Sequence, residues 1–224
     1  MYPLGPLPAD VRAGMVAGIA SDTRAPMTAR SRTPAPTELP PDTVIAGGNL
    51  CLRPPRAEEA ELYAAWWSCP EAQWGFCSDA RTAADIRSAL PELEAEARDA
   101  GHWTEFVLEQ DGCPVGSLWF SLWDLETRTC DLNILIGEPA LRGQGLARRA
   151  IRLLCAWAFR HADLEKIRLC PREDHFPAIR CYRAAGAHLG GRCPDAVHWR
   201  GETVFFRELY FLRTDFRAES LAPA

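Results

Sequence analysis

The feature that most constrains this chain is an uninterrupted succession of strand, glycine loop and helix between Thr129 and Phe159. The run from Thr129 to Ile136 is apolar and rich in β-formers, and Gly137-Glu138-Pro139 ends it. After the loop, apolar side chains recur at helical spacing on one face: Leu146, Ala150, Leu154 and Trp157. This unit predicts the centre of a mixed α/β domain.

The loop itself has the composition of an anion-binding turn. The first N–H groups of a helix have no intrahelical acceptor, and the helix dipole adds partial positive charge there. Gly143 and Gly145 let the backbone approach a ligand, while Arg142 adds a guanidinium that suits phosphate oxygens. The dinucleotide fingerprint and the nucleoside-triphosphate loop are both excluded, because the third glycine and a Gly-Lys-Ser/Thr sequence are missing.

Two segments carry a resemblance to a known family. The stretch from Arg142 to Ala147, RGQGLA, resembles the Arg-x-x-Gly-x-Ala signature with which GCN5-related N-acetyltransferases (GNAT) hold the pyrophosphate of acetyl-coenzyme A. HFPAIRCYRAAGA, starting at His175, resembles their Asn-x-x-Ala-Ile-Arg-x-Tyr-x-x-x-Gly-Phe segment, with His175 in place of asparagine and Ala187 in place of phenylalanine. The resemblance covers residues 50–212. It implies the GNAT fold, an α/β (α+β) protein whose mixed, mostly antiparallel central sheet is flanked by helices.

The chain divides by composition into three parts. Residues 1–47 are rich in proline and small polar residues and lack a periodic apolar face, so we expect disorder there. Met15 and Met27 also offer alternative starts within this segment. The N-acetyltransferase domain is expected over residues 48–215, and a frayed tail over residues 216–224.

Within the domain, local patterns predict the elements. Helices are expected over 57–67, 82–100 and 176–185, in addition to the helix after the glycine loop, and 68–78 is expected to be irregular. Thr82 is the expected N-cap of the second helix, with Asp85 three residues on. Asp111-Gly112 predicts a hairpin turn. Strands are expected over 49–53, 104–109, 114–122, 129–136, 166–169, 187–193 and 202–212.

Composition limits the partners and the compartment. The net charge of −5 argues against a nucleic-acid partner and favours a cationic substrate. No apolar run approaches the roughly 20 residues of a membrane span, and no secretory signal pattern opens the chain, so a cytoplasmic protein without membrane association is expected. The nine cysteines form no Cys-x-x-Cys pair and the histidines have no metal spacing, so we expect no metal.

The resemblance implies acetyl-coenzyme A as co-substrate and direct transfer of its acetyl group, without an acyl-enzyme. Tyr182 would then lie beside the coenzyme sulfur and protonate the leaving thiolate, whereas packing in the core is its alternative role. Backbone N–H groups near the end of the central strand would stabilise the oxyanion. The residues implied in coenzyme binding are Ile134, Leu135, Ile136, Arg142, Gly143, Gln144, Gly145, Leu146, Ala147 and His175.

Removing a proton from the acceptor is the harder chemical step. An alkylamine with a pKa near 10.4 is neutral in only about one molecule in 2,500 at pH 7. Asp131 and Asn133 share one face of the central strand, and Glu138 follows its end. Asp131 is the first candidate base and Glu138 the second. By resemblance, Asn133 replaces an aspartate of the aminoglycoside 6′-N-acetyltransferases, and Asp131 matches the ribosomal-protein N-terminal acetyltransferase-like branch.

The acceptor groove is expected among aromatic and polar residues: Trp67, Trp74, Trp123, Asp124 and Asn133. For Trp67, packing between the first two helices is the alternative. The favoured acceptor is a small cationic amine, an aminoglycoside or related polyamine, which would make the chain an antibiotic-resistance enzyme. Two alternatives stay open: a protein N-terminal α-amine, and a catalytically silent acyl-coenzyme A-binding module. Dimers among family members leave a homodimer open as well.

Overall fold

The structure is a computed structural model of the chain, and it describes residues 44–88, 105–124 and 126–216. The disorder expected over most of residues 1–47, the second half of the helix expected over 82–100, and the tail after residue 216 lie outside the described residues.

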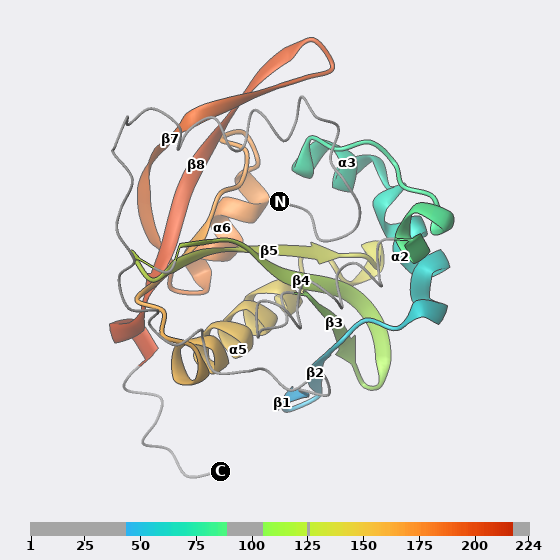
Figure 1. The fold of residues 1–224 in the computed structure, drawn as a ribbon, viewed down its shortest axis with the longest axis horizontal. Helices are drawn as coiled ribbons and strands as arrows, with labels where there is room; N and C mark the ends of the chain where they lie inside the picture. Colours follow the sequence, from blue (N-terminus) through green and yellow to red (C-terminus); the bar gives the residue numbers. More distant parts are fainter. Residues whose placement is uncertain (1–43, 89–104, 125, 217–224) are drawn as a thin grey trace, which may run out of the picture.

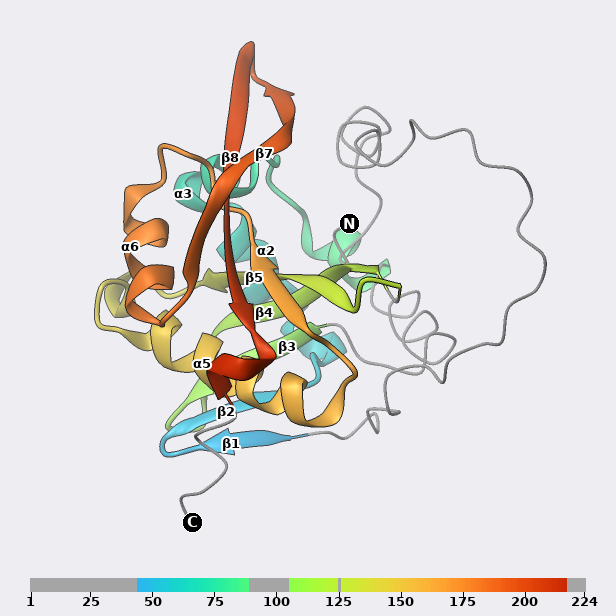
Figure 2. The ribbon, with the colours of Figure 1, turned by 90° about the vertical axis from the view of Figure 1, so that its left-hand side faces the viewer.

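One eight-stranded sheet organises the described domain, in the order β1-β2-β3-β4-β5-β6-β8-β7 (Figure 1). Neighbouring strands are antiparallel except for the parallel pair β5 and β6, which confirms the predicted mixed, mostly antiparallel sheet. The β7–β8 hairpin extends beyond the rest of the sheet (Figure 2). The strands are β1 (Ile45–Gly47), β2 (Leu50–Arg53), β3 (Glu105–Gln110), β4 (Cys113–Asp124), β5 (Thr129–Ile136), β6 (Lys166–Leu169), β7 (His188–Trp199) and β8 (Glu202–Leu212).

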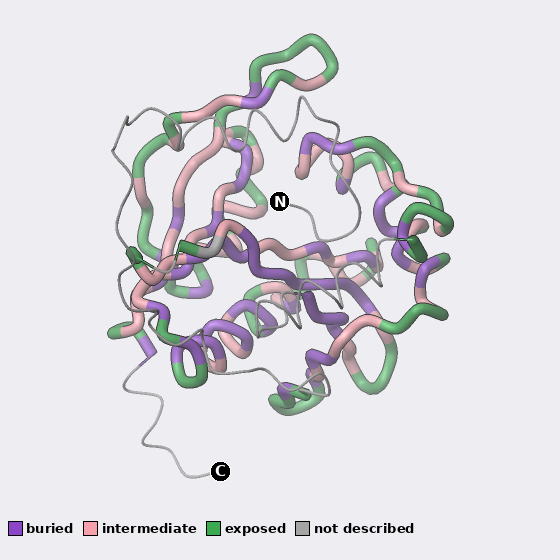
Figure 3. The backbone as a smooth tube through the Cα atoms, viewed as in Figure 1, coloured by how far each residue is buried: buried purple, intermediate pink, exposed green. Residues whose placement is uncertain are grey.

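Helices cover both faces of the sheet because its central strands are apolar on both sides. On β5, Cys130 and Leu132 join the core beneath α5, while Leu135 points the other way and joins the core beneath α2. Figure 3 shows buried residues along the central strands and on one side of α5. No helix in the described ranges is long and apolar enough to cross a bilayer. The helices are α2 (Ala60–Trp67), preceded by the 3-10 turn η1 (Ala57–Glu59), α3 (Pro70–Phe76), α5 (Leu146–His161) and α6 (Phe176–Ala184).

Most predicted elements are confirmed within a few residues, and β5, β6 and β8 coincide with their predicted ranges. Asp111 and Gly112 have φ angles of 53° and 78°, as a tight hairpin requires. The amide of Asp85 donates to the Thr82 hydroxyl at 3.1 Å, which confirms the predicted cap of a helix whose described part is 83–88.

Three predictions of local structure were wrong. The stretch predicted to be irregular contains α3 (Pro70–Phe76), whose C-cap Cys77 has a left-handed φ of 48°. A helix this short has no full apolar repeat to reveal it, although proline is favoured at a first helical position. Strand β1 lies inside the segment expected to be disordered up to residue 47, and β7 continues past residue 193 as far as Trp199.

The feature that positions the site is the divergence of β5 and β6. Only Thr129–Asp131 pair with Lys166–Arg168, after which β5 continues to Ile136 while β6 ends at Leu169. Beyond Leu169 the chain turns at Cys170-Pro171 toward α6. An opening therefore forms between two strands at the centre of the sheet.

The core beneath α2 contains a buried carboxyl group. Glu105 on β3 is 1 % exposed, and its neighbours include Tyr63 of α2. Burial raises the pKa of Glu105 to about 8, and the nearby Tyr63 hydroxyl offsets this only in part. Glu105 is therefore mostly protonated in the folded chain at neutral pH.

This burial makes stability depend on pH in a predictable direction. Between the ordinary pKa of 4.5 and the folded value of about 8, the unfolded chain loses the Glu105 proton while the folded chain keeps it. The free energy of unfolding should therefore fall with rising pH, by about 1.4 kcal/mol per unit from this group. Glu105→Gln should remove that slope in urea titrations from pH 5 to 8, whereas Glu126→Gln, in an exposed turn, should keep it. Parallel slopes for Glu105→Gln and wild type would contradict the prediction.

Candidate active site

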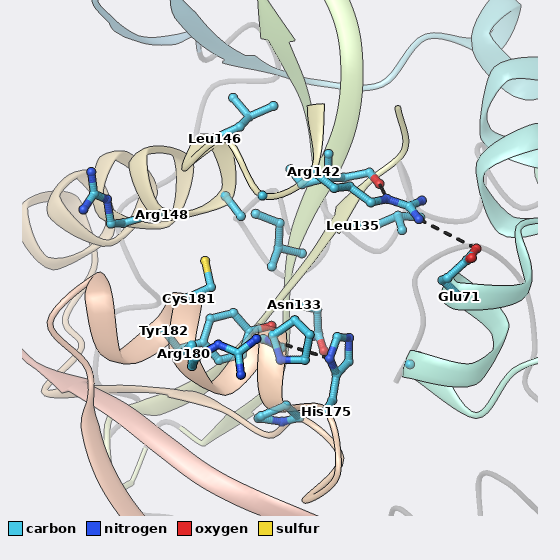
Figure 4. A pocket seen from close by; sticks show the side chains of 18 of the residues that line it. Glu71, Asn133, Leu135, Arg142, Leu146, Arg148, His175, Arg180, Cys181 and Tyr182 are labelled. Carbon is cyan, nitrogen blue, oxygen red and sulfur yellow. Dashed lines mark hydrogen bonds and ion pairs between the residues drawn. The ribbon is translucent and has the colours of Figure 1, made fainter. Parts of the chain in front are cut away.

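A cavity of about 890 Å³ opens where β5 and β6 part (Figure 4). The end of β5, the loop into α5, the start of α6 and one side of α3 line it. The structure brings every residue implied in coenzyme binding into this lining, together with Tyr182 and Asn133: Ile134, Leu135, Ile136, Arg142, Gly143, Gln144, Gly145, Leu146, Ala147 and His175.

The loop before α5 forms a cradle of backbone. Gly143 and Gly145 have φ angles of 75° and 79°, which other residues adopt only with strain. A Cβ on either residue would meet nothing within 4 Å, so the conformation rather than a lack of space requires glycine. Gly145 is the N-cap of α5 and provides no side-chain cap. The first N–H groups of this 16-residue helix are therefore left for a ligand.

Arg142 lines the cavity and also contacts the elements on either side of its loop. Its Nε donates to the carbonyl of Ile136 at 3.0 Å, and one Nη lies 3.5 Å from the Cys69 sulfur. The other Nη lies 3.7 Å from a carboxylate oxygen of Glu71 on α3 (Figure 4). The guanidinium thus ties the loop to β5 and α3. Its contact with the coenzyme phosphates stays a prediction.

Tyr182 lies on α6 with its ring half-buried, both lining the cavity and packing against the main core. Burial raises the pKa of its phenol, and the nearby thiols of Cys181 and Cys170 raise it further. The hydroxyl therefore keeps its proton at physiological pH. That protonation state fits a proton donor and excludes a phenolate.

His175 fills the structural role that asparagine has in many helix caps. It is the N-cap of α6, and its Nδ1 accepts from the amide of Ala178 at 3.4 Å. Its ring lies against Trp74, with centroids 5.0 Å apart, and burial lowers its pKa. Because Nδ1 is the acceptor, the proton of the neutral ring lies on Nε2. His175 thus caps the helix and presents a donor at the edge of the cavity.

The two acids predicted as bases are engaged elsewhere. Asp131 is 8 % exposed and accepts from Nε of Arg168 at 2.6 Å, because the parallel register places these residues side by side. Burial raises the pKa of Asp131, while Arg168 opposes the rise. Glu138 accepts from the indole nitrogen of Trp66 at 3.2 Å. Neither acid is among the described residues that line the cavity, and their role as bases stays a prediction.

Of the described residues predicted for the acceptor groove, Asn133 lines the cavity, and Trp67, Trp74 and Asp124 are not among its lining residues. Trp67 is 1 % exposed and packs on Trp119, which is the core role named as its alternative. Trp74 packs on His175 and under the guanidinium of Arg172, 4.2 Å away, rather than lining the cavity. Asp124 is exposed and accepts from the amides of the following turn. The side chain of Trp123 lies outside the described part of the structure.

Asn133 does line the cavity, and its amide donates to the hydroxyl of Ser121 at 3.0 Å. Sequence reasoning assigned no site role to three further lining residues: Phe76 on α3, Phe206 on β8, and Cys170 after β6. They reach the cavity from distant parts of the chain, so only the tertiary fold brings them together. Glu71 is the carboxylate among the described lining residues.

Comparison with known proteins identifies a family domain in the same region of the chain. The sequence model of the Acetyltransferase (GNAT) domain matches residues 49–188. The chain is 24 % identical to mouse (Mus musculus) alpha/beta-tubulin-N-acetyltransferase 9 over 161 residues, covering 65 % of this chain and 64 % of that protein. It is 27 % identical over 55 residues to a Caenorhabditis elegans N-acetyltransferase 9-like protein, covering 25 % of this chain and 27 % of that protein. The chain thus covers less than two thirds of either relative.

Two solved structures illustrate the similarity of fold. Spermidine N-acetyltransferase from Vibrio cholerae, in complex with CoA and spermine, has a TM-score of 0.66 at 17 % identity, covering 75 % of this chain and 98 % of that one. Ribosomal-protein-S5-alanine acetyltransferase from Vibrio fischeri also has a TM-score of 0.66, at 15 % identity, covering 79 % of this chain and 100 % of that one.

The cap at His175 yields a paired prediction. His175→Asn keeps a side-chain acceptor for the Ala178 amide and should leave the free energy of unfolding within about 0.5 kcal/mol of wild type. His175→Ala removes the acceptor and should lower it by about 1 kcal/mol in urea titrations. His161→Ala, in the last turn of α5, is a matched histidine deletion outside the cavity. Equal losses for the asparagine and alanine variants would show that the cap contributes nothing.

Proposed function

The chain belongs to the GNAT acetyltransferase family, and from this premise we propose that it is an N-acetyltransferase that acetylates the α-amine of a polypeptide N-terminus. The choice of acceptor rests on one observation: the acidic residues around the cavity already have hydrogen-bond or ion-pair partners. Asp131 is paired with Arg168, Glu138 accepts from Trp66, and the lining carboxylate Glu71 faces Arg142.

In the proposed site, backbone groups bind the coenzyme. N–H groups from Gly143 to Ala147 would hold the diphosphate, and the free edge of β5 from Ile134 to Ile136 would hold the pantetheine. Acetyl-coenzyme A supplies a thioester carbonyl to this site when bound. Arg142 keeps the loop attached to Ile136, which fixes the cradle relative to the strand edge.

The residue proposed to donate a proton is Tyr182. Its phenol stays protonated because burial raises its pKa, and its ring packs on the core. Transfer from a phenol to a thiolate of pKa near 8.5 is uphill, by about 2 kcal/mol for a phenol of pKa 10 and by more for a buried one. A hydroxyl positioned in advance offsets part of this cost, because it needs no reorganisation when the thiolate forms.

The acid–base arithmetic favours an acceptor that loses its proton easily. An α-amine with a pKa near 8 is neutral in about one molecule in ten at pH 7, a deficit of about 1.4 kcal/mol. An alkylamine of pKa 10.4 has a deficit of about 4.6 kcal/mol and needs a dedicated base. Because Asp131 and Glu138 are already engaged, the α-amine is the better match.

Two of the similar proteins have names that specify protein acceptors, the mouse tubulin acetyltransferase and the ribosomal-protein-S5-alanine acetyltransferase. The lining of the cavity supports an uncharged residue beside the amine, since it includes Phe76, Phe206 and Gly75. A small polyamine is the second candidate, favoured by Glu71 in the lining and by the fold of the spermidine enzyme. Nothing in the described lining distinguishes an aminoglycoside from other polyamines.

The acceptor classes are separable in one assay of thiol release from acetyl-coenzyme A. We expect peptides with a free α-amine to react at least about tenfold faster than the same peptides blocked at the N-terminus but containing lysine. The rate should rise toward pH 8 as the α-amine loses its proton. Preference for spermidine or an aminoglycoside would reject the peptide acceptor. Absence of thiol release with every amine, despite coenzyme binding, would indicate a silent binding module.

Tyr182→Phe tests the proton donor. We expect turnover to fall by about 100-fold, as for loss of a general acid, with coenzyme affinity within twofold of wild type. Tyr210→Phe provides the matched control, since Tyr210 lies on β8 against Lys166 and does not line the cavity. Unchanged turnover in Tyr182→Phe, measured at saturating acceptor, would return this residue to a packing role.

A further inference from the structure

A glycine within the short helix α3 forms part of the wall of the cavity. Gly75 lies one residue before the end of α3 and lines the cavity together with Ala72 and Phe76 of the same helix. Glycine makes a helix less stable than alanine does, because it loses more backbone freedom on folding. Helix propensity therefore does not explain why this position is glycine.

Neither the backbone nor the packing requires glycine at this position. Gly75 does not have a positive φ angle, and the left-handed position that follows α3 is occupied by Cys77 instead. A Cβ on Gly75 would lie 3.6 Å from Cδ2 and 3.7 Å from Nε2 of His175, and both are ordinary van der Waals distances. Alanine would therefore fit, and its methyl group would occupy space beside the His175 ring that glycine leaves open.

The location of this space indicates which part of a substrate would occupy it. In the proposed site the coenzyme lies along the glycine loop and the free edge of β5, with its thioester near Tyr182. The wall formed by α3 is a separate part of the lining, and Figure 4 shows Glu71 of α3 and Tyr182 of α6 on different sides of the site. The space beside Gly75 is thus available to the acceptor.

The geometry of the reaction brings the first side chain of a peptide acceptor into the cavity. An α-amine reacts only when its nitrogen comes within about 3–3.5 Å of the thioester carbon. The side chain of the first residue is attached to the carbon next to that nitrogen, so it must enter the cavity as well. Beyond Glu71, the lining that α3 contributes is apolar, at Ala72, Gly75 and Phe76, which suits an uncharged side chain.

We infer that the space beside Gly75 receives the side chain of the acceptor's first residue, and that Gly75 determines how large this side chain can be. The inference rests on the proposed peptide acceptor, and it adds the residue that selects among N-termini. A branched first residue such as valine is then accepted as well as glycine, because no side chain at Gly75 occupies the space it needs.

Two peptides that differ only in their first residue, glycine or valine, test the inference on the full chain through kcat/KM for thiol release. Wild type should acetylate both. Gly75→Ala adds one methyl group to the space and should lower kcat/KM for the valine peptide about tenfold or more, the effect that one such group has in a closed apolar pocket. For the glycine peptide, kcat/KM should change less than twofold.

Two further measurements and a control variant separate selectivity from a general defect. In Gly75→Ala, coenzyme affinity should stay within twofold of wild type by calorimetric titration, and the midpoint of urea unfolding should be equal or higher. Gly191→Ala is the matched control, since Gly191 is an exposed residue of β7 outside the described lining whose Cβ would meet nothing within 4 Å. This variant should leave the rates with both peptides unchanged.

Several results would overturn the inference while leaving the proposed function intact, because wild type would still acetylate a peptide. They are a wild type that accepts the glycine peptide but not the valine peptide, and a Gly75→Ala variant that changes neither rate or lowers both by the same factor. A tenfold loss of coenzyme affinity in Gly75→Ala would assign the space to the coenzyme instead. If wild type acetylates neither peptide, the proposed function is rejected, and this inference with it.

Discussion

The site depends on where the pairing of β5 with β6 ends and the two strands separate. The Asp131–Arg168 ion pair lies at the last paired position, buried on the Asp131 side. Removing one partner from a buried pair leaves an uncompensated charge, so such a pair holds two strands in a defined register. Beyond it, the edge of β5 is free over Ile134–Ile136, and the cavity occupies the space that a continued parallel pair would fill.

Much of the chemistry at this opening is assigned to backbone rather than to side chains. Gly143 and Gly145 allow left-handed turns, and Gly145 leaves the start of α5 uncapped. Arg142 and His175 then act as supports, since one fixes the loop to Ile136 and the other caps α6. Some residues of the two family motifs, Arg142 and His175, thus hold the backbone in place. His175 can replace asparagine in this role because its Nδ1 also accepts from the amide of Ala178.

The sequence was sufficient for the sheet and for the glycine loop that lines the cavity, because both depend on local signals. Alternating apolar residues determine where β5 lies, and the glycine loop follows it directly in the chain. The acceptor half depends on contacts between distant segments. Arg168 is far from Asp131 in sequence, so no local pattern indicated that this acid was already paired. Likewise α3, which brings Glu71 to the cavity, is too short to produce a recognisable period.

Charge is distributed unevenly between the two ends of the site, and this asymmetry links the acceptor proposal to the coenzyme proposal. At the acceptor side, Glu71 and Asp131 are each paired with an arginine, Arg142 and Arg168. At the far side, Arg148 of α5 is exposed and has no carboxylate partner within the described chain. Free cations stabilise a polyphosphate ligand, whereas neutralised acids give little attraction to a polycation. The same distribution therefore favours tight coenzyme binding together with an acceptor of a single, weakly basic amine.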